Sequence, residues 1–176
     1  ATRNTAGPTK STGGWRCTVR SNLVLRNYEA GVRLDLGSAD NVIVGNVCAS
    51  NVLYGLHLYK GDETPEPGDD GRPKRNWFAF NLVQGNGSDG INLSDSDDNT
   101  FATNVFSGNS DTLRFERGFG NWLDGNSVPT NVIVKTFGSV FDVPITYLRN
   151  QPLMRVQVDA FSTTVFEDAE GRIFDP

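Results

Sequence analysis

The feature that most constrains the fold of this chain is a recurring pair of asparagines five positions apart. The pairs are Asn22/Asn27, Asn41/Asn46, Asn76/Asn81, Asn99/Asn104 and Asn121/Asn126, and in all but the first a third asparagine follows at the same spacing. Segment 60–75, rich in Pro, Gly and charged residues, reads as an inserted loop, and without it the pairs recur about every 22 residues. A repeat of this length predicts a stack of similar units.

Each of the first four units runs into a short stretch in which apolar and polar residues alternate. These stretches are Gly31–Asp35, Gly55–Tyr59, Gly90–Ser94 and Thr112–Glu116. A period of two residues is typical of a strand, and no helical period is present. Three short strands per unit predict an all-β, single-stranded right-handed parallel β-helix (solenoid) of about five coils, because each coil can hydrogen-bond to the next about 4.8 Å away.

Stacking turns each position of the repeat into a row of side chains. The rows expected in the core are Val24, Ile43, Phe78, Phe101 and Leu123; Cys48, Val83, Phe106 and Val128; and Val32, Leu56, Ile91 and Leu113. Asparagine suits the corners between strands, because its amide tolerates left-handed backbone and bonds to the same amide in the next coil. The asparagine rows are therefore interpreted as structural, not as sugar ligands.

The whole chain is expected to form one domain built around these coils. We predict an N-terminal arm at 1–14, β-helix coils at 15–136 with the loop at 60–75, and capping or flanking strands at 137–176, where short β-prone runs replace the repeat. The opening residues have no charged start followed by an apolar stretch, so we expect a signal peptide to be absent or already removed. No stretch has the length and apolar character of a membrane span.

Composition narrows the range of partners. A formal net charge of −5 argues against nucleic acid, whose binding relies on Lys and Arg displacing counterions. Cys17 and Cys48 are compatible either with a disulfide or with two small buried side chains. Together with the single His57 they do not assemble a metal site, and the acidic residues are dispersed among rows, so we expect no metal and no cofactor.

Two outward rows of the third strand carry the richest polar chemistry. They are Arg33, His57, Asn92 and Arg114, and beside them Asp35, Tyr59, Ser94 and Glu116. Cations, an imidazole, a phenol and carboxylates at the spacing of the coils could hold an extended, acidic sugar chain. The alternative interpretation is a solvated outer face with no ligand.

The repeat ends in Gly-Ile-x-Leu and, over roughly residues 15 to 135, resembles the carbohydrate-binding and sugar-hydrolase β-helix family, which includes NosD-like repeats and alginate C5-epimerases. The resemblance implies the β-helix fold and an association with polysaccharide, and it is compatible with several activities. The epimerases carry Tyr-Gly-Phe-Asp-Pro-His on the equivalent strand. Here that strand reads Tyr54-Gly55-Leu56-His57-Leu58-Tyr59, so only the first two residues match.

Three functions are compatible with these observations. The leading hypothesis is an extracellular or periplasmic polysaccharide-binding module, alone or within a larger lyase or epimerase, with substrate-binding residues Arg33, Asp35, Tyr54, Asn92 and Glu116. The second is a complete small lyase or epimerase acting on uronate polymers, with His57 as base, Tyr59 (or Tyr54) as acid and Arg114 (or Arg33) neutralising the substrate carboxylate. The third is a noncatalytic structural or oligomerisation module, whose outward Trp77 and Trp122 contact another chain.

Overall fold

The computed structural model describes residues 9–60, 70–116, 121–127, 134–137, 146–148, 154–156 and 166–168. Thr112, Phe115, Glu116, Asp124 and the strands from residue 134 onward are described by their backbone. All the regular elements in these ranges are strands, as the two-residue period predicted. Nothing in the described part of the chain forms a helix long and apolar enough to cross a membrane.

Three parallel sheets surround one core, and each receives one strand from each coil. Sheet 1 has the order β1 (Thr9–Thr12), β4 (Ala30–Asp35), β7 (Tyr54–Tyr59), β10 (Asp89–Ser94), β13 (Asp111–Glu116) and β15 (Val134–Phe137). Sheet 2 has the order β2 (Thr18–Arg20), β5 (Val42–Val44), β8 (Trp77–Ala79), β11 (Thr100–Ala102), β14 (Trp122–Asp124) and β16 (Thr146–Leu148). Sheet 3 has the order β3 (Leu23–Leu25), β6 (Val47–Ala49), β9 (Leu82–Gln84) and β12 (Val105–Ser107).

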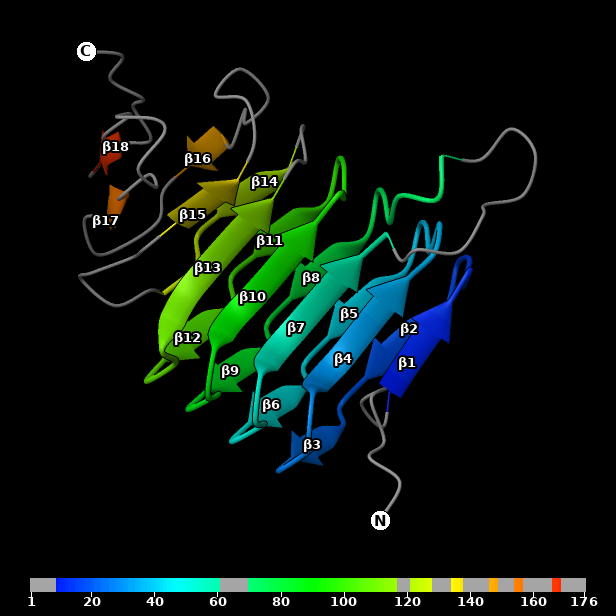
Figure 1. Ribbon diagram of the computed structural model, residues 1–176, viewed down its shortest axis with the longest axis horizontal. Coiled ribbons are helices and arrows are strands. Elements are labelled where there is room, and N and C mark those ends of the chain that lie inside the picture. The colour runs from blue at the N-terminus through cyan, green and yellow to red at the C-terminus, as the bar shows by residue number, and fades with distance from the viewer. Residues whose placement is uncertain are drawn as a thin grey trace.

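The chain winds as a right-handed parallel β-solenoid (Figure 1). Sheet 1 faces the viewer, and the chain returns through sheets 2 and 3 behind it before it enters the next strand of sheet 1. The described strands complete about four turns, against a prediction of about five. An antiparallel pair follows, β17 (Met154–Val156) with β18 (Phe166–Asp168), but most of the predicted cap at 137–176 lies outside the described residues.

Asparagine ladders run along all three corners of the solenoid. They are Asn41–Asn76–Asn99–Asn121, Asn22–Asn46–Asn81–Asn104–Asn126 and Asn27–Asn51–Asn86–Asn109. In the second ladder, Asn81 Oδ1 accepts both the backbone N–H and the side-chain N–H of Asn46, at 2.9 and 3.0 Å. Asn81 Nδ2 donates to Asn104 Oδ1 and to the Ile43 carbonyl, at 2.9 Å each. Each inner amide thus ties three coils together.

The first coil departs from the predicted alignment. Asn22 lies in the ladder with Asn46, and Val24 pairs with Cys48, whereas Val19 is the residue that pairs with Ile43. The sequence interpretation had placed Asn22 and Val24 one corner too early. The first coil lacks the first asparagine of the triplet, not the third, because Cys17 occupies that corner and its backbone N–H donates to Asn41 Oδ1 at 2.9 Å.

The left-handed backbone expected at the asparagines belongs to the residue before the asparagine wherever that residue is described. Positive φ values occur at Arg16, Asp40, Arg75 and Asp98 on one corner, at Ser21, Gly45, Phe80, Thr103 and Gly125 on the next, and at Arg26, Ser50, Gly85 and Gly108 on the third. A non-glycine residue in this region costs on the order of 1–2 kcal/mol. The asparagine is therefore retained for its amide, whose hydrogen bonds stabilise a turn made by its neighbour.

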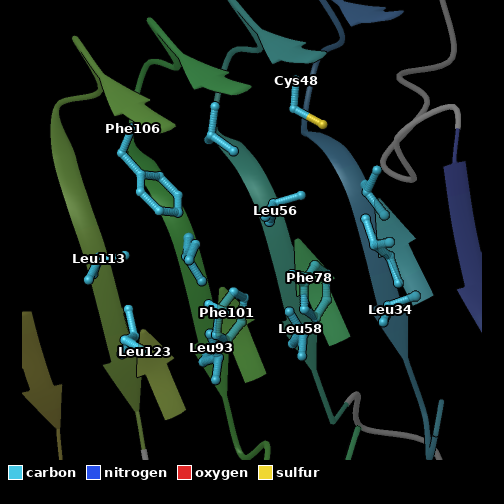
Figure 2. Close-up of a cluster of buried hydrophobic side chains, with 14 of the residues drawn as sticks. Leu34, Cys48, Leu56, Leu58, Phe78, Leu93, Phe101, Phe106, Leu113 and Leu123 are labelled. Carbon is cyan, nitrogen blue, oxygen red and sulfur yellow. The ribbon is translucent and has the colours of Figure 1, made fainter. Parts of the chain in front are cut away.

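The core is a continuous column of apolar side chains, seen in Figure 2. Its buried members are Val24, Val32, Leu34, Ile43, Cys48, Leu56, Leu58, Phe78, Val83, Ile91, Leu93, Phe101, Phe106, Leu113 and Leu123. Phe78 and Phe101 stack with their ring centroids 4.7 Å apart and their planes 12° from parallel. The predicted core rows are confirmed apart from the displaced Val24, and the predicted core residue Val128 lies outside the described residues.

The glycine at the second position of strands β4 and β7 in sheet 1 is explained by crowding against the core. A Cβ atom on Gly55 would lie 2.2 Å from Val83 Cγ1 and 2.8 Å from Asn86 Nδ2. Gly31 has a similar position, with Cys48 Cβ 2.9 Å away. The recurring glycine therefore makes room for the corner asparagine, so that the last ladder can pack against sheet 1.

The two cysteines remain separate thiols. Cys48 is buried in the core, where desolvation raises the pKa of its thiol to about 12, and Cys17 is exposed on the first coil. The interpretation of Cys48 as a small buried side chain is confirmed. Burial at this depth keeps Cys48 protonated and chemically inert at neutral pH.

Replacing Asn81 by Ala should lower the free energy of unfolding by about 1–3 kcal/mol, because Asn46 and Asn104 would each lose a buried partner. Chemical denaturation followed by circular dichroism measures the change. Asn22→Ala is the matched control, since Asn22 is the exposed first member of the same ladder. An Asn81→Ala variant no less stable than the Asn22→Ala variant would show that the ladder does not stabilise the fold.

Candidate functional site

The outer face of sheet 1 gathers the residues predicted to form a site. The pairing register places Lys10, Arg33, His57, Asn92 and Arg114 in one row across successive strands. A second row contains Thr12, Asp35, Tyr59, Ser94 and Glu116. Both predicted rows are confirmed, and no described element crosses in front of this face (Figure 1). We call these two rows, with Glu29, Tyr54 and Asp89, the polar face.

Several side chains of the polar face are more buried than is usual on the outer face of a sheet. His57 is 7 % exposed, Asn92 5 % and Asp35 3 %, and Asp89 is fully buried. Side chains on the outside of a single sheet are ordinarily solvated on that side. Here they shield one another, so the face behaves as a small polar core in which each unmet hydrogen bond carries a penalty.

Ion pairs organise the N-terminal half of the polar face. Arg33 donates to Glu29 Oε1 at 2.6 Å and lies 3.1 Å from Asp35 Oδ2, which also lies 3.2 Å from Lys10 Nζ. The Arg33 side chain is only 13 % exposed. Arg33 was predicted to hold an anionic sugar, but in the structure two carboxylates already neutralise its charge.

Three rings form a cluster beside these ion pairs. The His57 ring lies between Tyr54 and Tyr59, with centroid distances of 4.5 and 5.7 Å. The guanidinium of Arg33 stands over the Tyr59 ring, 5.3 Å from its centroid. Tyr54 and Tyr59 remain partly exposed. Their ring faces offer the kind of surface on which a sugar ring packs.

Several buried polar atoms of this face have no partner among the described residues. Glu29 Oε2, Asp35 Oδ1 and His57 Nδ1 are each buried without a hydrogen bond. Such atoms cost about 1–3 kcal/mol each unless an ordered water or a ligand satisfies them. These atoms lie on, or just before, the adjacent strands β4 and β7, so the unmet hydrogen-bonding capacity of the described side chains is concentrated on this face.

His57 is held in its neutral form. Desolvation by burial, reinforced by the positive charge of Arg33, lowers the pKa of His57 to about 3 from an ordinary 6.5. A neutral imidazole donates one hydrogen bond and accepts another, which suits a hydroxyl group. As a general base at neutral pH it is weak, because its conjugate acid is far too strong. The predicted role of His57 as catalytic base is therefore poorly supported by its surroundings.

The structure also adds residues that the sequence rows did not contain. Asp89 accepts a hydrogen bond from Asn92 Nδ2 at 2.8 Å, and Glu29 binds Arg33. Position 89 has the parity of the inward residues Ile91 and Leu93, so strict alternation would turn it inward, yet its carboxylate meets Asn92 of the outward row. The pairing register of sheet 1 is the same on both sides of Gly90. The remaining predicted site residues, Arg114 and Glu116, lie on β13, in the same two rows.

Among the described residues, no group of three or more His, Cys, Asp or Glu side chains is arranged to hold a metal ion. The chain was also compared with known proteins. No model of a protein family matches it, and neither a curated protein nor a solved structure is detectably similar. The described structure therefore stands as a parallel β-solenoid with asparagine ladders.

The burial of neutral His57 predicts a specific pH dependence of stability. Between pH 6.5 and about 3 the unfolded chain binds a proton at this histidine and the folded chain does not. Its contribution to stability is thus fully present above pH 6.5 and is lost as the pH falls, by up to about 1.4 kcal/mol per pH unit.

The His57→Asn variant, which takes the side chain found at the next position of the row, should lose less stability than the parent between about pH 7 and pH 4. Denaturant titrations at several pH values measure both proteins. Equal losses for the two proteins would mean that His57 titrates normally and is not desolvated.

Proposed function

We propose that this chain is a noncatalytic polysaccharide-binding module that holds an extended sugar chain along the polar face of sheet 1. The observation that carries the proposal is the group of buried, unpartnered atoms, Glu29 Oε2, Asp35 Oδ1 and His57 Nδ1, beside the rings of Tyr54 and Tyr59. Sugar hydroxyls donate to carboxylate oxygens and exchange hydrogen bonds with imidazole, while the C–H faces of sugar rings pack on aromatic rings.

The repeat of the solenoid suits an extended polymer. Equivalent residues of successive coils recur about every 4.8 Å along the stack, which is comparable with the length of one pyranose unit. His57 and Asn92 occupy consecutive positions of one row, and Tyr59 and Ser94 of the next. Tyr54 and Tyr59 are partly exposed, and side chains of this kind change rotamer within nanoseconds, so a ligand can reach the atoms beneath them.

Charge favours a hydroxyl-rich ligand over a strongly anionic one. The described side chains of the polar face include Lys10, Arg33 and Arg114, but Arg33 and Lys10 already share Asp35, and Arg33 also binds Glu29. Asp89 adds a further buried carboxyl group. A uronate polymer would have to displace these carboxylates from the cations. We therefore propose a neutral or sparsely charged polysaccharide in place of the acidic one expected from the sequence.

The same surroundings favour binding over catalysis. Abstraction of a C5 proton needs a base whose pKa lies near the working pH, and His57 has a pKa of about 3. As part of this proposal we group the chain with the β-helix repeat proteins that bind or process carbohydrate. We also propose that the protein is extracellular or periplasmic, where it would encounter polysaccharide. The sequence repeat supports the grouping, and the ladders at the corners support its structural basis.

Binding should weaken when the ring platform is removed or when the carboxylate acceptor is replaced by a neutral amide. We expect Tyr59→Ala and Asp35→Asn each to weaken binding to the best-bound neutral polysaccharide by about tenfold, the equivalent of about 1.4 kcal/mol. Affinity electrophoresis over a panel of neutral glucans, mannans and xylans, with alginate and polygalacturonate as acidic members, measures the change. Gln84→Ala, an exposed substitution in sheet 3, is the matched control and should bind as the parent does.

Melting temperatures of the variants ensure that any loss is not caused by unfolding. Retardation of the parent by acidic members alone would contradict the charge argument. Failure of the parent to bind any member of the panel would contradict the proposal as a whole. Release of unsaturated uronate product, detected by its ultraviolet absorbance, would show a lyase instead of a binding module.

A further inference from the structure

The chain contains a single Asn-Gly pair, Asn86-Gly87, at the corner that precedes β10. Asn86 is a buried member of the ladder Asn27–Asn51–Asn86–Asn109. In an unstructured chain an asparagine followed by glycine readily loses its side-chain amide, because the missing side chain of glycine lets the next peptide nitrogen reach the amide carbon. The fold therefore places a chemically reactive pair inside one of the ladders that hold it together.

Gly87 is required by the close approach of the neighbouring coil. A Cβ atom at position 87 would lie 2.3 Å from the carbonyl oxygen of Val52, which belongs to the backbone and cannot move aside as the end of a side chain can. The residue after the ladder asparagine is Val52 in the coil before and Ser110 in the coil after, and each donates its backbone N–H in the same way. Glycine, and with it the reactive pair, is thus a requirement of this coil.

Four hydrogen bonds hold the amide of Asn86 in the folded chain. Its Oδ1 accepts from the backbone N–H and from the side-chain N–H of Asn51, at 3.0 and 2.9 Å. Its Nδ2 donates to the Cys48 carbonyl at 3.2 Å and to Asn109 Oδ1 at 2.8 Å. The amide carbon cannot turn toward the nitrogen of Gly87 without breaking these bonds.

The nitrogen that would attack this amide is also engaged. The backbone N–H of Gly87 donates to the Asn51 carbonyl at 2.9 Å. Gly87 is exposed, so base from the solvent can approach it, and protection depends on the hydrogen bonds and not on exclusion of water. A hydrogen-bonded N–H exchanges its proton when its bond opens. The reaction therefore requires local opening of this corner.

We infer that Asn86 is a latent deamidation site, which the ladder protects in the folded chain and which reacts when the corner opens. A base removes the proton of the Gly87 N–H, and the nitrogen forms a bond to Cγ of Asn86 while the Cγ–Nδ2 bond breaks and ammonia leaves. Water then opens the resulting cyclic imide at either carbonyl, which gives aspartate or isoaspartate. Water is consumed, and nothing is oxidised or reduced.

The modified chain should not regain the native ladder. Aspartate lacks the Nδ2 donor, so its carboxylate would face two acceptors, the Cys48 carbonyl and Asn109 Oδ1, at a buried corner. Isoaspartate also adds a methylene group to the backbone, which would displace Gly87 from the Asn51 carbonyl. Unfolding should therefore become irreversible as the open chain is modified.

Peptide mapping of the full 176-residue chain tests the protection, and it does so independently of the proposed function. Samples are held at mildly alkaline pH in buffer and in concentrated urea, and mass spectrometry measures the exchange of amide for carboxyl at each ladder asparagine. We expect Asn86 to be modified in urea and to react about a hundredfold more slowly in buffer. Asn51, which has the same corner position but precedes Val52, is the internal control and should stay intact in both. Equal rates in buffer and urea, or no reaction of Asn86 in urea, would overturn the inference.

Refolding tests the consequence of the modification. After the period in urea the chain is diluted into buffer, and size-exclusion chromatography separates the refolded protein from the rest. Modified Asn86 should be concentrated in the fraction that fails to refold. The Asn86→Asp variant, which reproduces one product, should melt about 5 °C or more below the parent or fail to fold. Modified Asn86 shared equally between the two fractions, or an Asn86→Asp variant as stable as the parent, would show that deamidation does not make unfolding irreversible.

Discussion

The hydrogen bonds between stacked asparagine amides are the interaction on which the rest of this structure depends. An amide offers a donor and an acceptor at one position, so Asn81 can accept from Asn46 and donate to Asn104 in the same geometry at every coil. At the buried corners these bonds take the place of hydrogen bonds to water. The residue before each described corner asparagine adopts a strained left-handed backbone, where its position is described. Once the corners are fixed, the strands between them have one possible register, and every position of the repeat becomes a row.

That logic explains which features could be predicted from the sequence. The spacing of the asparagines and the alternation in the strands of sheet 1 indicated the parallel solenoid, the core rows and the outward rows, because stacking converts spacing into position. The first coil was misaligned, since Cys17 replaces the asparagine of its first corner and the count then starts at the wrong residue. Glu29 and Asp89 were missed because Glu29 precedes its strand and Asp89 has the parity of the inward residues, so neither belonged to the outward rows read from the sequence.

The sequence predicted which residues share the face of the candidate site, but it did not predict how their side chains interact. Sequence rows show which side chains share a face, and they do not show how those side chains pair. Arg33 was expected to meet a ligand's charge, yet Glu29 and Asp35 neutralise it, and His57 was expected to accept protons, yet burial keeps it neutral. Both changes have one cause, the crowding of polar groups on adjacent strands, where ion pairing and desolvation outweigh the intrinsic properties of each residue. The result favours hydrogen bonding to hydroxyls over proton transfer.

The imidazole of His57 offers the most direct test of that account, because it is the only histidine in the chain and its ring nitrogens give a single set of signals in a long-range proton–nitrogen correlation spectrum. Spectra are recorded during titration with soluble gluco-, manno- and xylo-oligosaccharides. The account predicts the nitrogen shifts of a neutral ring at neutral pH, and a change at Nδ1 on addition of at least one of these sugars, while the backbone amide of Gln84 stays unchanged. A charged imidazole, or ring signals that no sugar moves even at saturating concentration, would contradict it.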